Sequence, residues 1–262
     1  PDLAVEIYGA AIERYEKRAV APGDRGSEAR ARLADAEHLA GMALEEIGQL
    51  DAAVERYERA LELTRATRGD DDRMTAIRED HLGLTLAAAG RAEEALAHHD
   101  AAIALFAAAA GPEHADTLTA RLNRTIALAA AGRRDEAIGA LTDLLPAVER
   151  TFGADHEVLG ISLDQLAIQL AEAERFEEAE ARHREAIALF EGDGAAPDRH
   201  LGIALGNLGH TIERARGCAD ALPHYERALE ILEDALGPAA RHTREVRAER
   251  DACREEVAPA KE

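Results

Sequence analysis

Tryptophan is absent from the 262-residue chain, and the other large aromatic residues are scarce, with four Tyr and four Phe. Hydrophobic residues nevertheless make up 47% of the sequence, and alanine supplies much of that share. Alanine is the best helix former and is depleted in strands. The composition therefore favours closely packed helices over sheets.

Basic residues are also few, since 31 Lys and Arg stand against 52 Asp and Glu, which gives a net charge of −21. This balance opposes any role that depends on neutralising phosphate groups or anionic lipid. We therefore expect no nucleic-acid partner and no membrane partner.

Cysteine is limited to Cys218 and Cys253, which are 35 residues apart. We expect two reduced, small helix residues in a cytoplasmic protein rather than a disulfide framework. No apolar run approaches the length of a membrane span, and no signal peptide is visible. Because the chain begins at Pro1 in the middle of a repeat, we expect a fragment or a processed product of a longer protein.

What the chain does contain is one stretch that recurs five times. It begins at Gly48 with GQLDAAVERY, and related stretches follow every 42 residues, at Gly90, Gly132, Glu174 and Arg216. A fixed period of a few tens of residues is typical of stacked-repeat proteins. A solenoid has no single core that limits its length, so we expect one domain over residues 1–262.

Apolar positions at helical spacing and Gly or Pro stop signals divide the chain into helix pairs. We expect a half-repeat at 2–20, then five pairs at 29–68, 73–110, 115–152, 157–191 and 199–236, and a capping helix at 241–257. The last helix is expected to be a cap because its sequence is highly charged, as the exposed end of a stack requires. Pro146 falls inside a second helix, so we expect the third pair to be locally irregular.

Small residues recur at one position of all five copies, namely Ala53, Ala95, Ala137, Ala179 and Ala221. With Gly41, Leu44, Gly48, Tyr57 and Ala60, and with the linker GPEHADT at 111–117, they resemble the tetratricopeptide repeat. The resemblance is to the 42-residue form found in kinesin light chain and in many bacterial multidomain proteins. It implies an all-α, right-handed α–α superhelix of about five helix pairs whose first helices line a concave groove. It also implies a binding or scaffolding role and no reaction.

Two ladders of residues at 42-residue steps are expected to face this groove, because residues three or four apart share a helix face. One ladder is Leu39, His81, Asn123, Gln165 and Asn207, and the other is Met42, Leu84, Ile126, Ile168 and His210. Three successive amides can donate to and accept from a peptide backbone that runs past them. The aliphatic residues would then form apolar pockets. The alternative is that the amides only solvate the groove or contact one another.

Carboxylates beside the ladders would favour a basic peptide, and Asp80 and Asp164 are the nearest. The alternative is that they are ordinary exposed helix carboxylates. The form of the family that grips a C-terminal carboxylate with groove lysines is not supported, because no Lys occurs between Lys17 and Lys261.

No catalytic, cofactor or metal signature is visible in the sequence. His98 and His99 are adjacent and diverge on a helix, and no cysteine pair has the spacing of metal ligands. Nucleophile elbows, phosphate-binding glycine loops and dinucleotide fingerprints are missing. We therefore expect a non-enzymatic module that binds an extended protein or peptide segment, basic or apolar, with no cofactor and no metal.

A second hypothesis is a scaffold segment of a larger signalling protein. The apolar face of the half-repeat at 2–20 would then pack on a neighbouring domain or form a homodimer.

Overall fold

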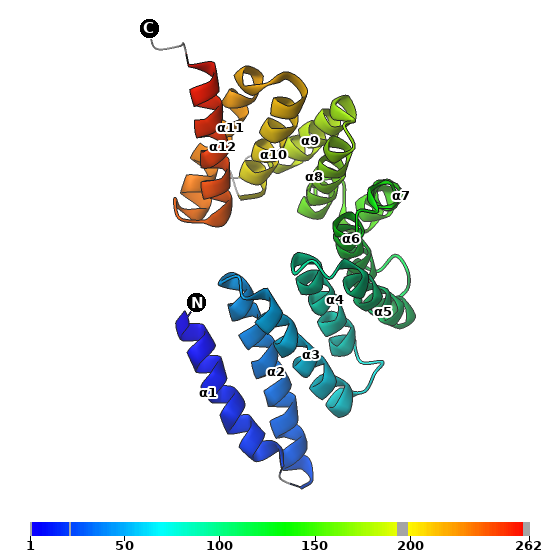
Figure 1. The fold of residues 1–262 in the computed structure, drawn as a ribbon. Helices are drawn as coiled ribbons and strands as arrows, with labels where there is room; N and C mark the ends of the chain where they lie inside the picture. The colour runs from blue at the N-terminus through cyan, green and yellow to red at the C-terminus, as the bar shows by residue number, and fades with distance from the viewer. Residues whose placement is uncertain (1, 21, 193–198, 259–262) are drawn as a thin grey trace. The chain divides into compact units, whose positions relative to one another are not determined.

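A computed structural model describes residues 2–20, 22–192 and 199–258, and these residues form 12 helices and no strand (Figure 1). The helices are α1 (Asp2–Ala19), α2 (Asp24–Glu46), α3 (Leu50–Arg68), α4 (Arg73–Ala88), α5 (Ala92–Ala110), α6 (Ala115–Ala130), α7 (Arg134–Phe152), α8 (Glu157–Glu172), α9 (Phe176–Phe190), α10 (Arg199–Arg216), α11 (Cys218–Leu236) and α12 (Arg241–Val257). Within the described ranges, no helix is long and apolar enough to cross a membrane.

One of these helices differs clearly in its bounds from the sequence-based expectation, since α2 begins at Asp24, upstream of the expected start at residue 29. Helix α7 runs from Arg134 to Phe152 with Pro146 inside it, as expected for the second helix of the third pair. A proline removes one intrahelical hydrogen bond, and the turns on either side are long enough to keep the helix continuous.

The chain divides into two compact units, Pro1–Glu136 and Ala137–Glu262. In the first unit, α1 packs on α2, and each helix packs on the next as far as α6. In the second unit, α8 to α12 follow the same order. First helices also touch across repeats, since α4 contacts α6, α8 contacts α10, and α10 contacts α12. Each unit is therefore a stack of helix pairs.

Small residues allow the close approach of paired helices. The five repeated alanines at positions 53, 95, 137, 179 and 221 are fully buried. A Cβ placed on Gly41 would lie 2.8 Å from the Tyr57 ring, and one placed on Gly83 would lie 2.8 Å from the His99 ring. The first helix thus uses glycine where the second helix inserts a ring, because a core at native density has no room for both groups.

The linkers between pairs explain three recurring polar residues. Asp72, His114 and His156 occupy the same repeat position, and each side chain accepts a hydrogen bond from the backbone N–H two residues further on. They are the N-caps of α4, α6 and α8. A side-chain acceptor at this position satisfies one of the free N–H groups at a helix start.

Cys218 and Cys253 form a disulfide, so the expectation of two reduced cysteines is wrong. Cys218 is the first residue of α11, and Cys253 lies near the end of α12, so the two helices run antiparallel and bring their distant ends together. The bond links the cap helix to the last pair. The cytoplasmic expectation rested on reduced cysteines and loses that support.

Candidate functional site

The predicted ladders lie on partly exposed helix faces. Leu39, Met42 and Ile126 expose 39%, 45% and 39% of their surface, which is high for large apolar side chains. His210 is exposed as well. The remaining ladder residues are half-buried, namely His81, Leu84, Asn123, Gln165, Ile168 and Asn207.

A hollow recurs at the same place of the repeat in each unit. In the first unit it measures about 150 Å³ and is lined by Ile77, Asp80, His81, Phe106, Asp116 and Thr119. In the second unit it measures about 160 Å³ and is lined by Ile203, Gly206, Asn207, His210, His242, Glu245, Val246 and Glu249. Five positions are equivalent, because 77, 80, 81, 116 and 119 recur after three 42-residue periods as 203, 206, 207, 242 and 245. Adjacent first helices thus form a hollow on the ladder face of both units.

Beneath the ladder of the first unit, Asp80 holds the amide of Asn123. The Oδ2 atom of Asp80 accepts a hydrogen bond from Asn123 Nδ2 at 2.8 Å, and its Oδ1 atom lies 2.7 Å from His99 Nδ1. Asp80 is 7% exposed, and His99 is fully buried. The carboxylate therefore joins α5, α4 and α6 through one buried polar cluster.

The second unit repeats this cluster two 42-residue periods later. Asp164 Oδ2 accepts from Asn207 Nδ2 at 2.8 Å, and Asp164 Oδ1 lies 2.7 Å from His183 Nδ1. The other ring nitrogen, His183 Nε2, lies 3.1 Å from Thr211 Oγ1. Here the cluster joins α9, α8 and α10.

These contacts change the role that we expect for Asp80 and Asp164. Asp80 and Asp164 are buried, with both carboxylate oxygens engaged, so they do not stand as free charges beside a bound peptide. Asn123 and Asn207 use one N–H each on them and keep a second N–H and the carbonyl oxygen. Gln165 differs, since its Oε1 is buried and has no hydrogen-bond partner among the described residues.

The end repeats use tyrosine and glutamate instead. Tyr57 Oη donates to Glu45 Oε2 at 2.7 Å, and Tyr225 Oη donates to Glu213 Oε2 at 2.6 Å. Burial, followed by these hydrogen bonds, raises the pKa of both phenols. The carboxylate lies 12 residues before a Tyr but 19 residues before a His.

The sequence analysis did not predict this pairing of ring and carboxylate, although the spacing of the residues indicates it. The two repeats with His at the ring position have Asp 19 residues earlier, and Tyr57 and Tyr225 have Glu 12 residues earlier. The middle repeat has Leu141 there, with Leu122 and Ala129 at the two carboxylate positions. Ring and carboxylate therefore change together.

In the first unit, one histidine beside the ladder is held neutral. His38 stacks on His81 with ring centroids 4.9 Å apart, and His81 Nδ1 lies 3.2 Å from His38 Nε2. Burial, together with the nearby charges of Arg78 and His81, lowers the pKa of His38 to about 4.

In the second unit, the ladder continues onto the cap helix. Glu249 follows Asn207 by one 42-residue period and lines the same hollow. Burial raises the pKa of the Glu249 carboxyl to about 7, with the carboxylates of Glu213 and Glu245 adding to the effect. His210 Nδ1 lies 3.8 Å from the Glu249 carboxylate.

Stacked helix pairs with these small-residue columns define an all-α repeat solenoid. Residues 74–149 and 126–192 match the family model of the tetratricopeptide repeat. These residues are tetratricopeptide repeats. A comparison with curated proteins gives no match.

Solved structures with the same fold include three of interest. BtubC (BKLC) from P. vanneervenii is 17% identical over 89% of this chain and 91% of its own, with a TM-score of 0.67. Repeats of a putative kinesin light chain from Podosopora anserina are 18% identical over 78% and 97%, with a TM-score of 0.61. A Rap protein complexed with competence and sporulation factor is 11% identical over 96% and 75%, with a TM-score of 0.70. At these identities the likeness is one of fold.

Proposed function

We propose that the ladder face of the first helices binds an extended segment of a partner protein, without catalysing a reaction. The observation that carries this proposal is the hollow that recurs at equivalent positions of both units. A surface built from repeats presents equal sites at equal intervals, which suits a segment that runs along it.

The chemistry of the face fits such a segment. Leu39, Met42 and Ile126 offer apolar surface, and Asn123 and Asn207 keep a free N–H and a carbonyl oxygen for a passing backbone. The buried aspartates fix the orientation of both amides before a partner arrives, so less side-chain freedom is lost on binding. The Rap protein of the same fold was solved in complex with competence and sporulation factor, so this fold accepts a bound factor.

Panning a random peptide library against the chain tests the proposal. The groove variant should carry Met42→Ser, Ile126→Ser and His210→Ser, because all three residues are exposed on the ladder face and none belongs to the buried clusters. A matched control carries Leu236→Ser on α11 and Ala97→Ser on α5, which are exposed away from the ladders.

We expect enriched peptides to bind the parent and the control alike and to bind the groove variant at least about tenfold more weakly. Peptides that bind all three proteins equally, with circular dichroism showing the groove variant folded, would overturn the proposal.

A second candidate function is association through α1. Its inner face carries Tyr8, Ile12 and Tyr15, which pack against the core of α2 and α3, whereas Leu3 and Ile7 expose 68% and 56%. A homodimer or a docked neighbouring domain would cover this outer face. Sizing chromatography of the double variant Leu3→Asp, Ile7→Asp tests self-association, since an unchanged oligomeric state would exclude this face as a dimer contact.

A further inference from the structure

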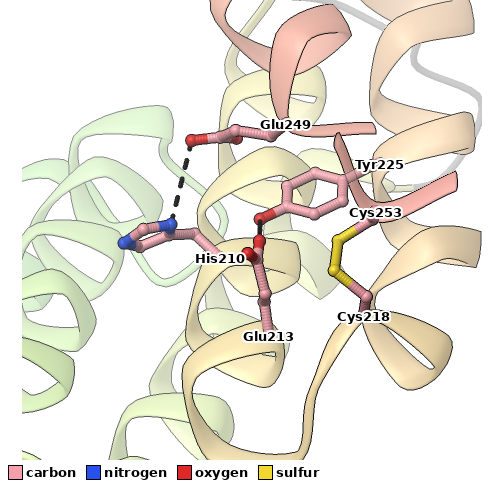
Figure 2. The surroundings of a disulfide bond; sticks show 6 residues. All are labelled: His210, Glu213, Cys218, Tyr225, Glu249 and Cys253. Atoms are coloured by element: carbon pink, nitrogen blue, oxygen red, sulfur yellow. Dashed lines mark hydrogen bonds and ion pairs between the residues drawn. A yellow bond between two sulfur atoms is a disulfide. The ribbon is translucent and has the colours of Figure 1, made fainter. Parts of the chain in front are cut away.

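The disulfide that joins the cap helix to the last pair lies beside a carboxylate (Figure 2). Cys218 is 4% exposed and Cys253 is fully buried. An oxygen of Glu213 and the two sulfur atoms all lie within 4.8 Å of one another. These three residues come from the end of α10, the start of α11 and the end of α12.

We propose that the reduced protein binds one Zn²⁺ ion through Cys218, Cys253 and Glu213. Thiolates and carboxylates are both established zinc ligands, and a tetrahedral ion would hold its sulfur ligands about 2.3 Å away. Three protein ligands leave the fourth position to solvent. Zinc would then replace the disulfide as the link that keeps α12 on the last pair in a reducing environment.

Forming the site needs a reductant, and a dithiol serves. Its two thiols give two electrons and two protons to the Cys218–Cys253 bond and leave as a disulfide, while the two cysteines become thiols. Zinc then displaces the proton from each thiol, so two protons are released for each ion bound. The oxidised protein has no thiolate to offer and should not bind zinc at this place.

The surroundings prepare the ligands for a cation. Cys218 is the first residue of α11, where the positive end of the helix favours a thiolate. Tyr225 Oη donates to Glu213 Oε2 and orients that carboxylate, as outer-shell partners of metal ligands do.

In the first repeat, the positions equivalent to Cys218 and Cys253 hold no cysteine. There, Tyr57 and Thr85 donate to the two oxygens of Glu45, at 2.7 and 2.6 Å. Four 42-residue periods later, Cys253 stands in place of Thr85, and Cys218 stands in place of Leu50. In the last repeat, two sulfur atoms therefore lie beside the equivalent carboxylate, at the positions that hold a threonine hydroxyl and a leucine in the first repeat.

Cobalt and zinc titration of the reduced chain tests the proposal. The chain is reduced with a dithiol, freed of reductant under argon, and titrated with Co²⁺, whose thiolate ligands give a charge-transfer absorption band. We expect the band to saturate at one ion per chain and to disappear when Zn²⁺ is added. We expect no band from the oxidised chain or from Cys253→Ser.

A matched pair of variants identifies the carboxylate ligand. Glu213→Gln should weaken Co²⁺ binding by at least about tenfold, whereas Glu45→Gln, which alters the equivalent pair of the first repeat, should leave it unchanged. Zinc should also raise the Tm of the reduced parent and of Glu45→Gln, but not of Cys253→Ser. A reduced chain without the band, or equal affinity in Glu213→Gln and Glu45→Gln, would overturn the proposal.

Discussion

The two units contain the same buried polar cluster and differ in one hydroxyl. The clusters are His99–Asp80–Asn123 and His183–Asp164–Asn207, with equal distances of 2.7 and 2.8 Å. In the second unit, Thr211 Oγ1 meets the remaining ring nitrogen. In the first unit, Ala127 occupies that position, and His99 Nε2 has no hydrogen-bond partner within the part of the chain that the structure describes. The aspartate is thus the shared centre of the cluster, and the threonine is an addition to it.

The largest expected effect comes from removing that centre. Asp80→Ala leaves the buried His99 and the half-buried Asn123 without their partner, so we expect a loss of about 3 kcal/mol in the first unit. Asp164→Ala should cost about 2 kcal/mol, because His183 keeps Thr211. Hydrogen exchange by mass spectrometry, read separately over α4–α6 and α8–α10, gives the opening free energy of each unit. Equal losses in the two units would show that the threonine contributes nothing.

The two units should also respond to pH in opposite directions. In the first, the folded-state pKa of His38 is lowered to about 4, so its contribution is complete above pH 6.5 and is lost as pH falls toward 4. In the second, the folded-state pKa of Glu249 is raised to about 7, so its contribution is complete below pH 4.5 and is lost as pH rises through 7. Glu213, Glu245 and His210 face this carboxyl.

Glu249→Gln should therefore stabilise the second unit by about 1–2 kcal/mol at pH 8 and change little at pH 4.5, after discounting for solvent screening. His38→Gln should stabilise the first unit by a similar amount near pH 4.5, because glutamine takes up no proton when the chain unfolds. Hydrogen exchange of each unit at the two pH values checks both. If both variants stabilised their units at the same pH, the assignment of the two pH dependences to His38 and Glu249 would be wrong.

The repeat architecture was predictable because packing fixes small residues at fixed intervals. Ala53 and its equivalents, and glycines such as Gly83, stand where helices or rings approach closely, so the 42-residue period appears directly in the sequence. The ladder residues were predicted from helical spacing together with the groove that the resemblance implies. Its residues are indeed half-buried or exposed, although their role in binding stays a prediction.

What the sequence did not reveal depends on contacts between distant residues. Asp80 was placed beside the ladder, but its burial and its two hydrogen bonds depend on how three helices meet. The disulfide was missed because the 35-residue separation of Cys218 and Cys253 is out of step with the repeat. It reflects one antiparallel pair of helices, α11 and α12, rather than a repeated position.

Exchanging the residues at positions 127 and 211 tests what the threonine hydroxyl contributes to each cluster. Ala127→Thr should supply His99 Nε2 with a partner and stabilise the first unit by about 1 kcal/mol, since a buried unpaired polar atom is costly. Thr211→Ala should weaken the second unit by about the same amount. Urea unfolding of both variants, with Ala127→Val as a control for added volume, measures the effect. If Ala127→Val stabilises the protein as much as Ala127→Thr, packing rather than the hydrogen bond is responsible.

The smallest expected effect concerns the turn within each helix pair. Gly48, Gly90 and Gly132 have φ angles of 76°, 79° and 74° there, whereas the fourth pair places Glu174 at φ 59°. A left-handed backbone strains a residue that carries a Cβ, typically by about 1 kcal/mol, and glycine relieves the strain but adds freedom to the unfolded chain. Glu174→Gly should therefore stabilise the second unit by about 0.5–1 kcal/mol, and Gly90→Ala should destabilise the first by about 1 kcal/mol. Thermal unfolding of the two variants would contradict this account if Glu174→Gly lowered the Tm, because the glutamate side chain would then contribute more than its backbone costs.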